Sequence, residues 1–172
     1  MHEKPDRLAL LALTALLPLG CATAGGEGLA VGAPAPMVAV TGFDGRTYDR
    51  RALAGQVVLL DLWASWCGPC KEELPLLDAM AARLRAKGVT VLAVSLDENR
   101  EDAVGFLKSR ERWSLALAHD PEGRLADRLK PARMPTSYII DRGGIIREVN
   151  AGFEREDVAR IEARLTQLAA QP

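Results

Sequence analysis

Residues 56–75 read QVVLLDLWASWCGPCKEELP, and the arrangement expected for the rest of the chain follows from them. The stretch begins with a continuous apolar run, Gln56–Ala64, which a single acid, Asp61, interrupts. Apolar runs of this length are typical of a strand that is buried on both faces. Cys67-Gly68-Pro69-Cys70 follows the run, and leucines at helical spacing come next. The pattern therefore predicts a buried strand that leads into a helix opening with two cysteines.

Strands and helices are expected to alternate on both sides of this stretch. Strands that are separated by helices imply parallel crossovers, and a terminal hairpin adds antiparallel edges. We therefore predict an α/β fold with a mixed central sheet, helices on both faces and an additional N-terminal β-hairpin. The expected elements are a hairpin of Met37–Val40 and Arg46–Tyr48, the strand Gln56–Ala64, a helix from Cys67 to about Lys87 with Gly88 as its C-cap, a strand at Val89–Leu96, a helix at Asn99–Arg110, a strand at Leu115–Ala118, a helix from Asp120-Pro121 to about Lys130, a hairpin of Thr136–Ile140 and Ile145–Val149, and a last helix with Val158, Ile161, Leu165 and Leu168 on one face.

The N-terminal segment has the composition of an export signal. Residues 8–19 read LALLALTALLPL, which is shorter than the roughly 20 residues of a membrane span but fits the core of a secretory signal. The junction Gly20-Cys21 resembles a bacterial lipoprotein signal, in which the cysteine is lipidated; an ordinary cleaved signal or an uncleaved anchor is the alternative. We expect a signal peptide at 1–20, a flexible tether at 21–33 and one domain at 34–170. The protein is then an extracytoplasmic lipoprotein, anchored to a membrane on the periplasmic side.

Composition and charge narrow the classes of function. The chain has 172 residues, of which 48% are hydrophobic and 26% charged, as in an ordinary globular protein. Its 22 basic and 23 acidic residues leave a net charge of −1, so we expect no nucleic-acid partner. Three cysteines are too few for a fold built on disulfides.

The two cysteines of the helix start have the spacing of a redox pair. A thiol at a helix N-terminus faces unpaired N–H groups and the positive end of the dipole, which favour the thiolate. Cys67 is then the attacking thiolate, and Cys70 is close enough to resolve a mixed disulfide formed on it. Gly68 and Pro69 complete this active-site loop and bias the geometry of the ring.

The cysteine pair has three other interpretations. Half of a zinc site would need further ligands, but His119 is the only histidine beyond the signal region. A structural disulfide would close too short a loop to constrain much of the unfolded chain. One-cysteine peroxidase chemistry would need a Thr or Ser where Ala64 stands. We therefore expect a redox dithiol and no metal site.

LDLWASWCGPCKEELP resembles the active-site segment of the thioredoxin superfamily, in particular its TlpA/ResA-like extracytoplasmic branch. Arg133-Met134-Pro135-Thr136, which precedes an expected strand, resembles the second signature of that family. The resemblance implies a three-layer thioredoxin-like sandwich, a cis Pro135 next to the dithiol, and main-chain groups of Met134 that bind an extended substrate. A plain proline at a strand start is the alternative for Pro135. Trp66 is expected to shield the site or pack on substrate, with a surface aromatic as the alternative.

Two acids are candidates for moving the proton of the second thiol. Asp61 interrupts a buried strand, where burial raises the pKa of a carboxyl group and lets it exchange protons near neutral pH. Glu73 lies three residues after Cys70 on the same helical face. Each matches an acid position of the family. The alternatives are an Asp61 in solvent at a strand end and a Glu73 that only interacts with the helix dipole.

The resemblance implies a thiol–disulfide oxidoreductase that reduces disulfides of extracytoplasmic proteins, for example in cytochrome c or copper-site maturation. It further implies a DsbD-like or CcdA-like membrane partner as the source of electrons. We expect a monomer that needs no cofactor beyond its own disulfide. A protein whose dithiol holds a soft metal such as Cu(I) without turnover is the alternative.

Overall fold

Strand β3 (Val57–Trp63) lies in the interior of the sheet, and every one of its residues is buried, as the apolar run predicted. It pairs in parallel with β4 (Val89–Ser95) and antiparallel with β6 (Thr136–Ile140). The full strand order in this computed structural model, which describes residues 29–171, is β2-β1-β5-β4-β3-β6-β7. The predicted mixed sheet is confirmed.

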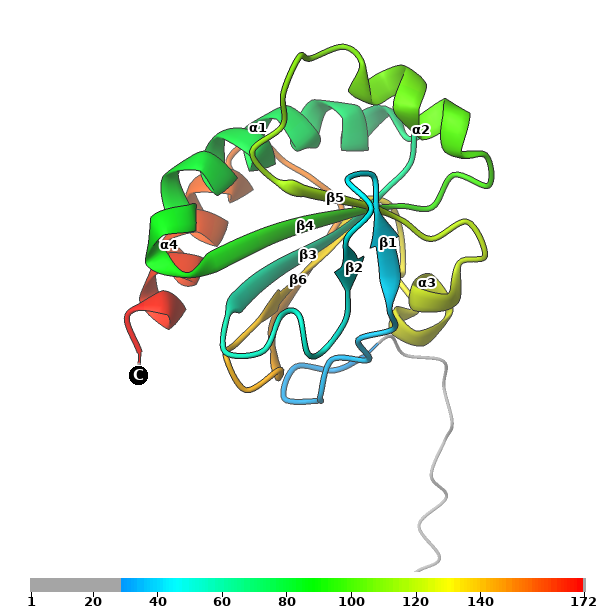
Figure 1. Ribbon diagram of the computed structural model, residues 1–172. Coiled ribbons are helices and arrows are strands. Elements are labelled where there is room, and N and C mark those ends of the chain that lie inside the picture. Colours follow the sequence, from blue (N-terminus) through cyan, green and yellow to red (C-terminus); the bar gives the residue numbers. More distant parts are fainter. Residues whose placement is uncertain (1–28, 172) are drawn as a thin grey trace, which may run out of the picture.

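Helices cover both faces of the sheet, as expected for a three-layer sandwich (Figure 1). Helices α1, α2 and α4 lie on one face, and α3 lies on the other. The first two strands pair antiparallel with each other, and β1 also pairs with β5. The remaining elements are β1 (Val40–Gly42), β2 (Thr47–Tyr48), α1 (Gly68–Leu84), the 3₁₀ turn η1 (Arg85–Lys87), α2 (Arg100–Leu107), β5 (Ala116–His119), α3 (Arg124–Leu129), β7 (Ile146–Ala151) and α4 (Asp157–Ala169).

Successive residues of β3 contribute to two different cores because side chains alternate between the faces of a strand. Val57, Leu59 and Trp63 pack with the helices α1, α2 and α4, whereas Val58, Leu60 and Leu62 pack on the side of α3. By the same alternation, Asp61 faces the layer that contains α1 and α4. The acid is therefore placed below the helix that carries the cysteines.

Helix α1 begins immediately after Cys67, which is its N-cap residue. Its buried face includes Leu74, Leu77, Ala81 and Leu84, the four residues whose spacing predicted the helix. The α-helix ends three residues before the expected Lys87 and continues as the turn η1. Gly88 follows with a φ of 76°, a left-handed conformation that glycine adopts without strain, so the expected C-cap is confirmed.

The predicted start of α3 is wrong. Asp120 and Pro121 belong to a turn that Gly123 closes by donating its N–H to the carbonyl of Asp120, at 3.0 Å. Gly123 has a φ of 64°, which interrupts helical geometry, and the helix begins only at Arg124. The Asp120 carboxylate still accepts hydrogen bonds from the N–H groups of Arg124 and Leu125, at 3.2 and 2.7 Å. Asp120 thus accepts hydrogen bonds from free N–H groups of the first helical turn, although it is not the residue immediately before the helix.

Several other boundaries differ from the expected ones. Helix α2 ends at Leu107 instead of Arg110, where its last carbonyl accepts a hydrogen bond from the Trp113 indole at 2.9 Å. Strand β1 begins at Val40, where the expected strand ended, and β5 is displaced by one residue toward its C-terminus. Strand β7 extends to Ala151, two residues beyond its expected end. That extension matters for the site because it brings β7 alongside the loop before β6.

The folded part of the chain begins before the expected boundary at residue 34. Gly32 donates its N–H to the carbonyl of Ile146 at 2.8 Å, and Ile146 donates to the carbonyl of Ala33 at 2.9 Å. These two residues were expected to belong to the tether, but they pair with β7. The expected signal peptide and Cys21 lie outside the described residues. Among residues 29–171, no helix combines the length and the apolar character that a membrane span requires.

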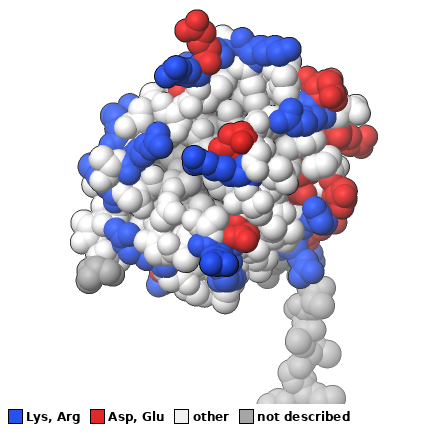
Figure 2. Space-filling model, in the orientation of Figure 1, with Lys and Arg blue, Asp and Glu red and all other residues white. Residues whose placement is uncertain are grey.

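Charged side chains of both signs are interspersed on the face that carries β1 and β2 (Figure 2). Two of them, Arg46 and Asp44 of the first hairpin, form an ion pair at 3.6 Å. A cavity of about 610 Å³ opens between this hairpin and the strands β4 and β5. Cys67 and Cys70 are not among its lining residues, so the cysteine pair lies outside this cavity.

Candidate active site

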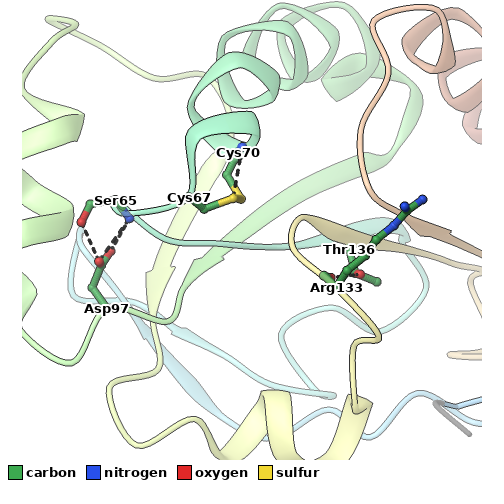
Figure 3. Close-up of a disulfide and its surroundings, with 6 residues drawn as sticks. All are labelled: Ser65, Cys67, Cys70, Asp97, Arg133 and Thr136. Carbon is green, nitrogen blue, oxygen red and sulfur yellow. Dashed lines mark hydrogen bonds between the residues drawn. A yellow bond between two sulfur atoms is a disulfide. The ribbon is translucent and has the colours of Figure 1, made fainter.

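Cys67 and Cys70 form a disulfide at the point where β3 leads into α1 (Figure 3). Strand β3 ends at Trp63, a short turn of Ala64–Trp66 follows, and the first helical turn contains Cys70. The Cα atoms of the two cysteines are 5.3 Å apart. The expected intramolecular pair is therefore present in the oxidised state.

The two sulfur-bearing residues differ in their access to solvent. Cys67 is 5% exposed, whereas Cys70 is fully buried. Trp66, beside Cys67, is 67% exposed, and Gly68 and Pro69 are exposed as well. Only Cys67 can therefore be reached by another protein without local opening, and an apolar indole stands next to it.

The start of α1 points a donor at the accessible sulfur. The N–H of Cys70 donates to Sγ of Cys67 at 3.3 Å. An N–H group in this position, together with the positive end of the helix dipole, stabilises a thiolate when the disulfide is reduced. The helix start therefore favours Cys67 as the nucleophile.

The loop before β6 contains a cis peptide bond between Met134 and Pro135, as the resemblance implied. One edge of this loop is bound to the end of β7, since the N–H of Gly152 donates to the carbonyl of Pro135 at 2.7 Å. The hydroxyl of Thr136 donates to the carbonyl of Arg133 at 2.5 Å, which fixes the loop from within (Figure 3). Within residues 29–171, the backbone N–H and C=O of Met134 make no hydrogen bond. The loop therefore presents one free main-chain edge.

Asp61 and Glu73 are both buried, at 0% and 2% exposure. In the described part of the chain neither Asp61 oxygen has a hydrogen-bond partner, and Oε2 of Glu73 has none. Burial raises the pKa of Asp61 well above its ordinary value, and the charge of Glu73 raises it further. The interpretation of Asp61 as an acid in solvent is therefore wrong. Helix α1 has no acid in its first turn, so Glu73 is not a first-turn acid that interacts with the helix dipole.

Glu73 has a pKa suited to proton exchange under ordinary conditions. Burial, together with the negative charge of Asp157, raises the pKa of Glu73 to about 8. Asp157 is in the first turn of α4 and is itself bound by Arg160, at 3.0 Å. A carboxyl group that ionises near neutral pH can both accept and return a proton.

Asp97 is a further buried acid near the site, and sequence reasoning did not single it out. Its carboxylate accepts hydrogen bonds from the Ser65 N–H at 3.0 and 3.1 Å and from the Ser65 hydroxyl at 2.7 Å (Figure 3). It also accepts a hydrogen bond from the Ser95 hydroxyl at 2.8 Å. These bonds fix the turn that precedes Trp66 and Cys67. The available signal was the position of Asp97 just after β4, because parallel neighbours end at the same edge of a sheet.

The aromatic side chains of Trp63, Trp113 and His119 are held by packing and hydrogen bonds. Trp63 is fully buried and its ring is 5.5 Å from that of Phe106. Trp113 packs against the same core, and its indole caps α2. The His119 ring lies 2.7 Å, through Nε2, from the carbonyl of Asp97. These contacts support packing roles for all three.

Comparison with known proteins gives a consistent picture. Residues 31–149 match the model of the AhpC/TSA family. A thiol-disulfide oxidoreductase ResA from Oceanobacillus iheyensis is 35% identical over 128 residues, which are 74% of this chain and 65% of that protein.

Solved structures with the same arrangement are also similar in sequence. One, described as a thiol:disulfide interchange protein DsbE from Chlorobium tepidum, is 36% identical with a TM-score of 0.77, covering 83% of this chain and 99% of the other. An exposed lipoprotein thioredoxin from Streptococcus pneumoniae is 28% identical with a TM-score of 0.66, covering 77% of this chain and 99% of the other. The fold is therefore shared with proteins that are described as redox proteins.

Proposed function

We propose that this chain, which belongs to the AhpC/TSA family and is a thiol–disulfide oxidoreductase, works as a reductase of disulfides in extracytoplasmic proteins. The observation that carries the proposal is the position of the Cys67–Cys70 disulfide at a helix start, with one sulfur accessible and two raised-pKa acids beneath it. In each turnover the protein dithiol becomes a disulfide, and the substrate disulfide becomes two thiols.

The first step uses the accessible cysteine. The Cys67 thiolate attacks one sulfur of the substrate disulfide, a Cys67–substrate bond forms, and the substrate S–S bond breaks. The expelled substrate sulfur leaves as a thiolate and takes up a proton. The hydrogen bond from the Cys70 N–H and the helix dipole lower the free energy needed to form the Cys67 thiolate.

The second step uses the buried cysteine. Cys70 loses its proton to a carboxylate, its sulfur attacks Sγ of Cys67, and the bond between Cys67 and substrate breaks. The second substrate thiolate leaves and the carboxyl group returns the proton. We assign the proton transfer to Glu73, because its pKa of about 8 keeps an ionised fraction at neutral pH. Asp61, whose pKa is raised by burial and by the charge of Glu73, titrates together with Glu73 and can hold a proton for it.

We assign substrate binding to the loop before β6 and to Trp66. The free main-chain edge at Met134 is suited to an extended substrate segment, which would add to it as a strand. We assign to the cis Pro135 the role of holding this edge toward the dithiol, and to the exposed Trp66, next to Cys67 in the sequence, an apolar surface for the substrate. The Cys67–Cys70 disulfide is the only redox group this reaction requires.

The location and the electron source extend the proposal. A lipid on Cys21 would hold the domain at the extracytoplasmic face of a membrane, and the likeness to an exposed lipoprotein thioredoxin supports this placement. Oxidised protein would be reset by a membrane thiol-reducing partner of the DsbD-like or CcdA-like kind. We propose apocytochrome c thiols or copper-site assembly proteins as substrates and a monomer as the working form.

The test is catalytic reduction of a disulfide peptide by the full-length protein in detergent, with a chemical dithiol as the electron source. The wild-type protein is expected to turn over, and Cys67→Ser and Cys70→Ser are expected to stop turnover. Cys21→Ser is the matched control, because it removes the remaining cysteine and leaves the pair intact. Stoichiometric copper binding without turnover by the wild-type protein would refute the reductase proposal.

A further inference from the structure

The guanidinium of Arg133, the residue before Met134, is held in place at the end of β7. Its Nε donates to the carbonyl of Ala151 at 2.8 Å, and Nη2 donates to the same oxygen. The guanidinium lies over Gly152, where an added Cβ would be 2.7 Å from Cζ, Nε and Nη2 of Arg133. Gly152 also has a φ of 85°, which side-chain-bearing residues rarely adopt. This position of the guanidinium therefore requires glycine at position 152. The charged group of an otherwise exposed side chain is thereby held in one place.

The charge of Arg133 is not used in an ion pair among residues 29–171. Among the ion pairs of residues 29–171, none includes Arg133, although Arg83, Arg147 and Arg160 each bind a carboxylate. A guanidinium has five N–H donors, and the bonds to Ala151 use two of them. At least three donors remain for a further acceptor, and orienting the group in advance lowers the entropy lost on binding.

The position of Arg133 relates it to the substrate edge proposed above. Arg133 directly precedes Met134, whose backbone groups have no hydrogen-bond partner within residues 29–171. The carbonyl of Arg133 accepts a hydrogen bond from the Thr136 hydroxyl, which fixes it in place. Figure 3 shows its side chain rising from the loop across the neighbouring end of β7. A strand added at Met134 would place its side chains about 5 Å from those of the loop, within reach of a long arginine.

We infer that Arg133 is a specificity-determining residue, which binds a carboxylate of an acidic substrate residue beside the substrate cysteine. The inference rests on the proposed function, because it takes Met134 as the edge to which substrate adds. The ligand is an extended polypeptide with Asp or Glu next to its cysteine. The guanidinium and the carboxylate form a paired, planar contact at the rim of the site.

The experiment uses pre-reduced full-length protein in single-turnover reactions with symmetric peptide disulfides. Three peptides of the form Ac-Ala-X-Cys-X-Ala-amide differ only in X, which is Glu, Gln or Lys. Rates are measured by acid quenching and chromatography of the released thiol peptide. At low salt the wild-type protein is expected to react about 3- to 5-fold faster with the Glu peptide than with the Gln peptide, and more slowly with the Lys peptide, which is the range of a partly exposed ion pair.

The variants separate charge recognition from a structural role. Arg133→Gln is expected to bring the Glu:Gln rate ratio close to one, and Arg133→Lys to keep part of it, since the charge remains while the fork on Ala151 is lost. Arg51→Gln is the matched control, because Arg51 is an exposed arginine near the opposite end of β3 and the ratio should stay at the wild-type value. Added salt is expected to reduce the wild-type ratio.

Two results would overturn the inference: a wild-type ratio near one, or an Arg133→Gln protein that keeps the wild-type ratio. If Arg133→Gln fails to fold, the wild-type ratio, its salt dependence and Arg133→Lys still decide. Failure of the proposed function looks different, because the wild-type protein would then reduce none of the three peptides.

Discussion

Replacing Glu73 by Gln isolates the proton transfer from the buried cysteine. The carboxylate is the form that accepts a proton, and with a pKa of about 8 the ionised fraction is about 1% at pH 6, 9% at pH 7 and 50% at pH 8. If proton transfer to Glu73 limits the attack by Cys70, the rate of that step should rise about tenfold from pH 6 to 7 and about fivefold from pH 7 to 8. Above pH 8 the rise should level off.

The step can be observed separately from the first one. Reduced protein mixed rapidly with excess 5,5′-dithiobis(2-nitrobenzoate) releases one coloured thiolate when Cys67 attacks. It releases a second when Cys70 resolves the mixed disulfide. We expect Glu73→Gln to slow the second release at pH 8 by about 10²-fold or more, the usual contribution of a positioned base. The first release should keep its rate.

Glu72→Gln is the matched control, because Glu72 is the adjacent acid of the same helix and is exposed. It should leave both releases and their pH profiles unchanged. The reasoning would be refuted if the second release in Glu73→Gln kept the wild-type rate and pH profile, or if Glu72→Gln lost them equally.

Three further changes test the surroundings of the dithiol. Asp157→Asn removes a charge that raises the pKa of Glu73, so the midpoint of the pH profile of the second release should move to lower pH; an unchanged midpoint would show that burial alone sets it. Asp61 keeps its proton in the folded state above the pH at which the unfolded chain loses it, so its contribution to stability is fully present below its ordinary pKa of 3.8 and is lost as pH rises toward its raised folded pKa. Asp61→Asn should therefore flatten the fall of the free energy of unfolding between pH 5 and 8, measured by urea titration, and an equally steep fall in the variant would contradict this. Asp97→Ala leaves the Ser65 N–H and its hydroxyl without their acceptor, so it should lower stability by about 1–3 kcal/mol and speed amide exchange at Ser65, whereas the exposed Asp102→Ala should do neither.

The elements that could be predicted from the sequence are those whose signals are local. The apolar run of β3, the cysteine pair and the spacing of leucines in α1 all lie within 30 residues, and each matches the structure. The prediction of the start of α3 was wrong because that start depends on the left-handed conformation of Gly123. Pro121 gave a misleading signal for an earlier start. A pattern read residue by residue cannot distinguish a capping aspartate from one that acts through an intervening turn.

The parts of the site that were missed depend on contacts between distant residues. Asp97 reaches Ser65 across 32 residues, and Arg133 reaches Ala151 across 18. Burial of Glu73 is likewise set by how α1 lies against the sheet and α4. The sequence identified Glu73 as a candidate but did not show whether its side chain is buried. The packing of the helices shows that it is.

A redox titration of the Cys67/Cys70 pair against defined thiol buffers tests the reductase proposal most directly. A reductase should have a midpoint potential near the value of thioredoxin, about −270 mV, so that its dithiol gives electrons to substrate disulfides. A midpoint near about −120 mV, the value of the strongest dithiol oxidants, would contradict the proposal, because the protein would then take electrons from its partners.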